Sequence, residues 1–203
     1  MGRPRAEDLE ARHAALLDAA MDTLMEMGVE AITMSAVATR AGASKATLYA
    51  WYGGREGLLT AVVERESDKS ARRVRAALAN PAPAVETLTA YCVDLLTMLT
   101  SPESIALNRA SMTSAELATV LLASGRHRVG PLVEEFLAQA SARGELVVDD
   151  PPDAYRELWG FAVRDTQIRV LLGEPAPSPA QIEQDAKVAV ERFMRAHGPH
   201  RLA

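Results

Sequence analysis

The chain has 203 residues and a net charge of −5, and 48% of its residues are apolar although only 4% are aromatic. The apolar content is enough to fill a sizeable core and excludes a disordered chain, and the abundance of Ala, Leu, Glu and Arg favours helices over a β-sandwich. The sequence contains no signal peptide, no apolar run near the roughly 18 residues of a membrane span, and only one cysteine, so we expect a cytoplasmic protein without membrane association, disulfide, metal or cofactor.

The apolar spacing predicts helices almost throughout the chain. A first helix is predicted to end at Gly28, and two short helices are predicted at about 34–41 and 45–52, with Ala41-Gly42-Ala43-Ser44 between them. A longer helix is predicted from Arg55 to about Leu78, where a proline follows shortly after.

Further along the chain, prolines and glycines separate more helices. These are predicted at about 83–100, 102–113, 115–142, 152–172 and 179–197. The expected fold is therefore all-α with about nine helices. It consists of a three-helix helix-turn-helix head at residues 1–54 and a larger C-terminal helical domain at 55–203, and the helix 55–79 connects the two.

The two short helices have the features of a helix-turn-helix. Thr33 is a candidate N-cap for the first, Gly42 permits the tight left-handed turn between them, and Ser44 is placed to cap the second. Spacing alone leaves two alternatives open, a DNA-binding head and an ordinary helix pair in an all-α core.

The second short helix is expected to bury Leu48 and Tyr52, one turn apart. That places Lys45 and Tyr49 together on another face, with Thr47 beside them. A short helix with a polar N-terminus and an apolar back suits insertion into the major groove.

Positive charge is concentrated locally although the chain is acidic overall. Residues 31–60 hold three cations against one carboxylate, and the N-terminal arm carries Arg3 and Arg5. Such arms contact phosphates or the minor groove, and the alternative for these two arginines is a solvated terminus.

The stretch 28–64, with A-G-A-S-K-A-T-L-Y-A-W-Y and R-E-G-L-L, resembles the N-terminal DNA-binding domain of the TetR family, and so does the preceding G-R-P-R arm. By position, the resemblance implies that the second short helix contacts bases or phosphates of DNA. It also implies that the start of the first short helix contacts the DNA backbone, and that Trp51 and Arg55 contact phosphates. With the arm and the capping serine, the expected DNA contacts are Arg3, Arg5, Thr33, Ser35, Ser44, Lys45, Ala46, Thr47, Tyr49, Trp51 and Arg55. The chain departs from the family pattern at three positions. The family frequently has Arg or another polar residue at Ser35 and an acidic residue at Ala36, and Phe is usual at Tyr52.

Residues 101–172 resemble the C-terminal domain of the AefR-like branch, in S-P-E-S-I-A-L-N-R-A, A-R-G-E-L-V-V-D-D-P and R-V-L-L-G. The resemblance implies a domain that binds a small effector and dimerises. Candidate effector-binding residues are Tyr91, Met98, Asn108, Arg109, Met112 and Trp159. Ordinary core packing is the alternative for each of them. Arg109 in the cavity would favour an anionic or carbonyl-bearing ligand, whereas an Arg109 that faces solvent predicts a neutral one.

The last two predicted helices are candidates for a dimer interface. The helix 152–172 is apolar on more than one face, which indicates burial against a partner. The last helix carries one apolar stripe, formed by Ile182, Ala186, Ala189, Val190, Phe193 and Met194. Two such helix pairs would form a four-helix interface.

The expected function is that of a TetR-type repressor that binds a palindromic operator as a homodimer and is released by a small-molecule effector. A helical enzyme is one alternative, but no acid–base constellation supports it. The other is a dimeric scaffold or small-molecule-binding protein without DNA binding.

Overall fold

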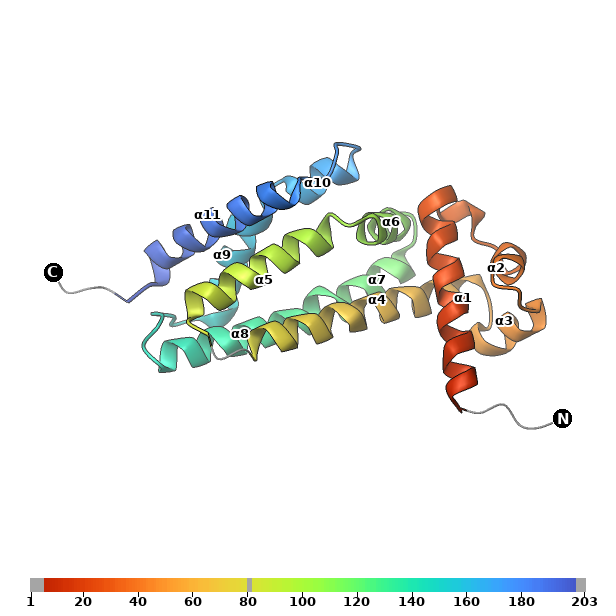
Figure 1. Cartoon of the computed structure of the whole chain (residues 1–203), viewed down its shortest axis with the longest axis horizontal. Coiled ribbons are helices and arrows are strands. Elements are labelled where there is room, and N and C mark those ends of the chain that lie inside the picture. The colour runs from red at the N-terminus through yellow and green to blue at the C-terminus, as the bar shows by residue number, and fades with distance from the viewer. Residues whose placement is uncertain (1–5, 80–81, 200–203) are drawn as a thin grey trace. The chain divides into compact units, whose positions relative to one another are not determined.

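The structure is a computed structural model that describes residues 6–79 and 82–199 (Figure 1). The described residues are helical and contain no strand, which confirms the all-α prediction. The helices are α1 (Ala6–Met27), the 3-10 turn η1 (Val29–Ala31), α2 (Met34–Arg40), α3 (Lys45–Tyr52), α4 (Arg55–Leu78), α5 (Ala84–Leu99), α6 (Pro102–Ser111), α7 (Ala115–Ser124), α8 (Arg126–Ala142), α9 (Pro151–Val163), α10 (Thr166–Leu171) and α11 (Pro179–His197). None of them combines the length and the apolar character that a membrane crossing requires.

The chain divides into two compact units. The first runs to Ser67 and includes Ala106–Leu121, and the second comprises Asp68–Ile105 and the residues from Leu122 onward. The first unit is thus larger than the predicted head at 1–54, because it also takes the first part of α4, the end of α6 and most of α7. The division falls inside α4, a single continuous helix.

The core of the first unit brings α1, α2, α3 and α4 together around buried aliphatic side chains. Val37, Leu48, Leu58 and Val62 are completely buried there. Side chains of α6 and α7, such as Leu107, join the same core. Burial of these apolar groups is the main source of stability for helices as short as α2 and α3.

The core of the second unit lies between α5, α8, α9 and α11. Tyr91 and Phe193 are its largest fully buried side chains, and Cys92 is completely buried. Helices α8 and α9 approach closely at Gly130, where a Cβ would lie 3.2 Å from Cε1 of Tyr155. A larger residue at that position would require the Tyr155 ring to shift.

Two helices that the pattern predicts as continuous are interrupted. The span 115–142 breaks at Gly125, whose φ of −92° and ψ of −97° are not helical, while Pro131 stays inside α8. The span 152–172 breaks at Arg164, which has a φ of 45° and pairs with Asp185 of α11 at 2.7 Å. Apolar periodicity continues across both breaks, so it could not locate them.

The apolar stripe of α11 is part of the monomer core. Its members Ile182, Ala186, Ala189, Val190 and Phe193 are all buried within the second unit. These side chains therefore face α5 and α9 of the same chain and not a partner. A dimer interface through the helices predicted at 152–172 and 179–197 stays a prediction for their outer faces. An amphipathic pattern shows that one face is buried, but it does not show which chain buries it.

Candidate nucleic-acid interface

Both short helices of the head begin at the predicted caps. The Thr33 Oγ1 accepts a hydrogen bond from the backbone N–H of Ala36 at 3.1 Å, and the Ser44 Oγ accepts one from Thr47 at 3.1 Å. Each cap satisfies a backbone N–H that would otherwise have no partner in the first turn. The sequence predicted these two contacts correctly.

The turn between α2 and α3 is left-handed at Gly42, where φ is 61°. The N–H of Ala43 reaches back to the carbonyl of Ala38 at 2.9 Å and closes the end of α2. A side chain at Gly42 would be strained in this conformation, so glycine fixes the angle at which α3 leaves α2.

The inner face of α3 packs on the core of the first unit. Leu48 is completely buried and Tyr52 is partly buried. Burial raises the pKa of Tyr52 to about 12, and its hydroxyl has no hydrogen-bond partner among the described residues. A phenylalanine would fill the same place without that unpaired group.

The outer face of α3 is exposed. It carries Lys45, Ala46, Tyr49 and Ala50, and Tyr49 is 54% exposed. Thr47 lies partly buried at the edge of this face, with its hydroxyl 2.9 Å from the Ser44 Oγ. The structure therefore leaves Lys45, Ala46 and Tyr49 accessible, whereas the Thr47 hydroxyl belongs to the capping arrangement.

Trp51 lies beside a residue of α1 that the sequence did not single out. Its ring centroid is 5.6 Å from that of His13, and the His13 ring is 5.3 Å from the ring of Tyr52. Trp51 is 36% exposed and His13 is exposed. No sequence motif joins α1 to α3, so only the packing of the two helices shows that His13 borders the candidate interface.

Arg55 has a structural role. Its Nε donates to the carbonyl of Ile32 at 2.8 Å, and its Nη2 donates to the carbonyl of Val29 at 2.6 Å. These bonds tie the first turn of α4 to the end of η1. They support a role in holding the head together, and the phosphate contact of Arg55 stays a prediction.

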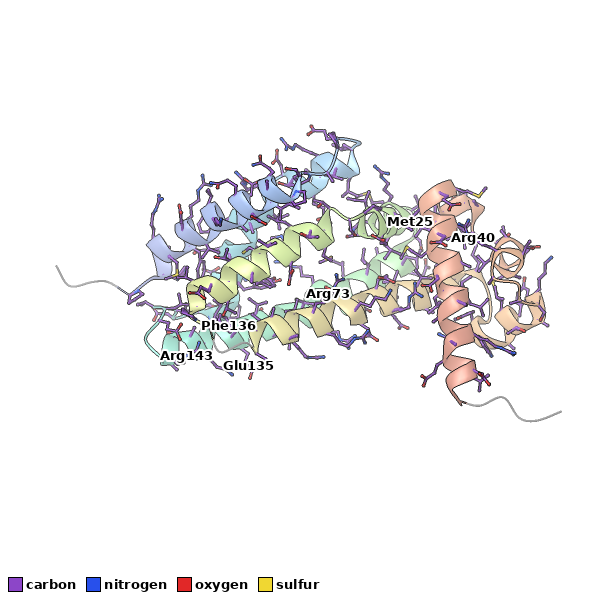
Figure 2. All side chains as sticks on the ribbon, in the orientation of Figure 1. Met25, Arg40, Arg73, Glu135, Phe136 and Arg143 are labelled. Carbon is purple, nitrogen blue, oxygen red and sulfur yellow. The ribbon has the colours of Figure 1, made fainter. Side chains whose placement is uncertain are left out.

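Arg40 is paired within the head (labelled in Figure 2). Its two terminal nitrogens reach the Glu26 carboxylate at 2.7 and 2.5 Å, and Asp22 lies 3.7 Å away. The hydrogen bond from Arg40 lowers the pKa of Glu26. Of the cations in residues 31–60, Lys45 alone has no ion-pair or hydrogen-bond partner within the described part of the chain.

The remaining predicted contacts lie at the start of α2 and in the arm. Thr33 and Ser35 are both exposed. Arg3 and Arg5 lie outside the described residues.

The six predicted effector-binding residues divide between the two units. Asn108, Arg109 and Met112 belong to the first unit, whereas Tyr91, Met98 and Trp159 belong to the second. Met112 follows the end of α6 and is 66% exposed, and its role in effector binding stays a prediction. Arg109 is also exposed.

The three residues of the second unit lie in or against its apolar core. The Tyr91 hydroxyl is 3.5 Å from that of Tyr155, and burial raises the pKa of both phenols. The guanidinium of Arg126, which the sequence analysis did not single out, lies 4.6 Å from the ring centroid of Trp159 and 5.6 Å from that of Tyr155. Met98 packs on the same core. A polar and aromatic cluster of this kind can orient a small ligand.

Known proteins resemble both parts of the chain. Residues 16–62 match the family described as bacterial regulatory proteins, tetR family, and residues 86–199 match the C-terminal domain of AefR-like transcriptional repressors. The chain is 32% identical over 154 residues to the HTH-type transcriptional repressor ComR of Escherichia coli, covering 71% of this chain and 70% of ComR.

Two further proteins extend this similarity. The uncharacterized HTH-type transcriptional regulator YdeS of Bacillus subtilis is 35% identical over 102 residues, and that match spans only 50% of this chain and 48% of YdeS. The crystal structure of a TetR transcriptional regulator from Agrobacterium tumefaciens has a TM-score of 0.77 and 33% identity, and the match covers 94% of this chain and 96% of that one. The likeness therefore extends over nearly the whole chain and is not confined to the head.

Proposed function

Because the chain belongs to the TetR family of bacterial transcriptional regulators and carries an AefR-like C-terminal domain, we propose that it is a repressor that binds a palindromic operator as a homodimer and leaves it when a small-molecule effector binds. Its family and relatives are regulators with a helix-turn-helix DNA-binding domain, not enzymes. Repression is proposed because the AefR-like family and ComR are both described as repressors.

The observation that carries this proposal is the exposed face of α3. Its N-terminus is capped by Ser44, its back is anchored by Leu48, and its accessible side chains include Lys45 and Tyr49. A short helix held in this way can enter a major groove about 12 Å wide. In a dimer with two-fold symmetry, two such helices about 34–36 Å apart would read two inverted half-sites.

The proposed dimer uses the exposed apolar side chains near the break between α9 and α10. Leu172 is 81% exposed and Ile168 is 47% exposed, and Phe161 is partly exposed. Large apolar groups left in water at one end of a folded unit favour association with a second copy. The outer face of this region replaces the buried α11 stripe as the candidate interface.

The proposed effector is small and largely apolar, and it lies against Met98, Trp159 and the Tyr91–Tyr155 pair. Arg109 is exposed, so it is not a charge partner inside the pocket. The guanidinium of Arg126 lies there in its place, so a ligand that carries a carbonyl or an anionic group is expected. Arg126 and the tyrosine hydroxyls would then orient a carbonyl or hydroxyl group of that ligand.

Release from DNA is proposed to act through α8 and α4. The first turn of α8 places Arg126 on the aromatic rings and Arg128 in an ion pair with Asp68 of α4. A ligand that displaces Arg126 would thereby act on α4, the helix shared by both units. A coupling free energy of roughly 1–3 kcal/mol is the usual scale for such regulation.

Selection of bound DNA from a random duplex pool tests the proposal. The expected product is an inverted repeat that the purified protein binds with nanomolar affinity at physiological salt, on the order of 10⁻⁸ M or tighter. The folded double variant Lys45→Ala/Tyr49→Ala is the matched control and should enrich no sequence. The proposal would be contradicted if the wild-type protein enriched no sequence, or if it enriched a site without inverted symmetry.

A further inference from the structure

The exposed face of α3 carries few hydrogen-bonding side chains. Along Lys45, Ala46, Tyr49 and Ala50, the accessible chemistry consists of one ammonium group, two methyl groups and one phenol, whose hydroxyl is the other hydrogen-bonding group. The Thr47 hydroxyl shares a hydrogen bond with the Ser44 hydroxyl at 2.9 Å, and Thr47 is partly buried. The helix carries no Asn or Gln, the side chains that read adenine through paired hydrogen bonds, and no Arg; Lys45 is its one side chain of the kind that reads guanine.

The apolar character of this face limits what it can distinguish in a major groove. Adenine, guanine and cytosine present hydrogen-bonding groups there, whereas thymine also presents the C5-methyl group. An alanine methyl makes no hydrogen bond, so its favourable partner is another apolar group from which water is removed. Among the four bases, only thymine offers one.

We infer that α3 selects its half-site through thymine C5-methyl groups, which pack against Ala46, Ala50 and the ring of Tyr49. This inference rests on the proposed operator binding and specifies its chemistry. Lys45 supplies the charged contact at the helix N-terminus, to guanine or to phosphate. The outward spacing of Ala46 and Ala50, one turn apart on one side of Tyr49, presents the three apolar groups as one continuous surface.

Replacement of single thymines by deoxyuridine provides the test, because it removes only the methyl group. With the selected operator, fluorescence anisotropy at fixed salt should show that Kd rises about fourfold for each half-site thymine under α3, as expected for one buried methyl of about 0.8 kcal/mol. Deoxyuridine in the flanking sequence should leave Kd unchanged.

Protein variants show which side chain contacts each thymine methyl group. The quantity compared is the Kd for the operator with uracil divided by the Kd for the operator with thymine, measured for the same protein. Ala46→Gly and Ala50→Gly should each bring this ratio close to one at a different thymine. Both DNAs bind the same protein, so lost helix stability cancels in the ratio. Ala76→Gly, at an exposed position of α4, is the matched control and should keep the wild-type ratio.

Three results would overturn the inference. A selected operator without thymine in its half-sites would do so, and so would an operator whose Kd is unaffected by every uracil substitution, or a ratio that neither glycine variant changes. In these cases sequence-specific binding, and with it the proposed function, still stands. Failure of the random pool to yield any site would instead refute the proposed function, and the inference with it.

Discussion

Replacing Arg55 by alanine should destabilise the head without removing a DNA contact. The substitution deletes two charge-assisted hydrogen bonds, to the carbonyls of Ile32 and Val29 at 2.8 and 2.6 Å. Hydrogen bonds to charged groups contribute about 1.5–3 kcal/mol each. Because Arg55 is only partly buried, water can form hydrogen bonds with the two carbonyls in the variant and offset part of this free energy. We therefore expect the free energy of unfolding to fall by about 2–3 kcal/mol in total.

Thermal unfolding followed by circular dichroism gives the first measurement. A chain of this size loses about 2–4 °C in Tm for each kcal/mol, so Arg55→Ala should unfold roughly 5–10 °C below the wild type. Arg55→Lys is the matched control. It keeps the positive charge but cannot reach both carbonyls at once, so its Tm should also fall.

Operator binding as a function of salt gives the second measurement. A phosphate contact by Arg55 would reduce the slope of log Kd against log salt by about one on mutation to alanine, and would spare the lysine variant. The structural role predicts an unchanged slope for both variants at a temperature where they are folded. A wild-type Tm combined with a reduced slope in Arg55→Ala would refute the reasoning.

Three other predictions follow from buried or exposed groups. Tyr52→Phe should raise the free energy of unfolding by about 1 kcal/mol in urea titrations, because it removes a buried hydroxyl without a partner among the described residues; a loss of stability would show that the hydroxyl is satisfied. Burial raises the pKa of Cys92 to about 12, so its thiol should react with a disulfide reagent at pH 8 only after unfolding. Reaction in the native protein at the rate of a free thiol would contradict the burial. Ile168→Glu/Leu172→Glu should yield folded monomer in light scattering; a dimer that survives this change would place the interface elsewhere.

Local chemistry explains which parts of the fold the sequence could predict. The caps at Thr33 and Ser44 and the left-handed Gly42 depend on neighbouring residues, and the structure confirms all three. The break at Arg164 could not be predicted, because it has no glycine or proline and the residue pairs with Asp185, a distant residue of α11.

The candidate interface divides in the same way. Exposure of Lys45 and Tyr49 followed from the helical period of α3, since Leu48 had to face the core. The roles of Arg55 and His13 depend on partners on other elements, namely η1 for Arg55 and α3 for His13. A sequence motif shows which family position a residue occupies. Packing against other elements decides whether a charged side chain at that position faces solvent or donates to a carbonyl oxygen.

Internal pairing of arginines also changes how the head would bind DNA. Arg40 pairs with Glu26, and Arg55 donates hydrogen bonds to backbone carbonyls. Lys45 is therefore the cation of residues 31–60 without a partner in the described structure. Affinity that is independent of sequence grows with the number of phosphates that a protein neutralises. Residues 31–60 therefore offer few accessible cations to phosphates, so we expect the contribution of this segment to DNA binding to depend on short-range contacts between α3 and the bases.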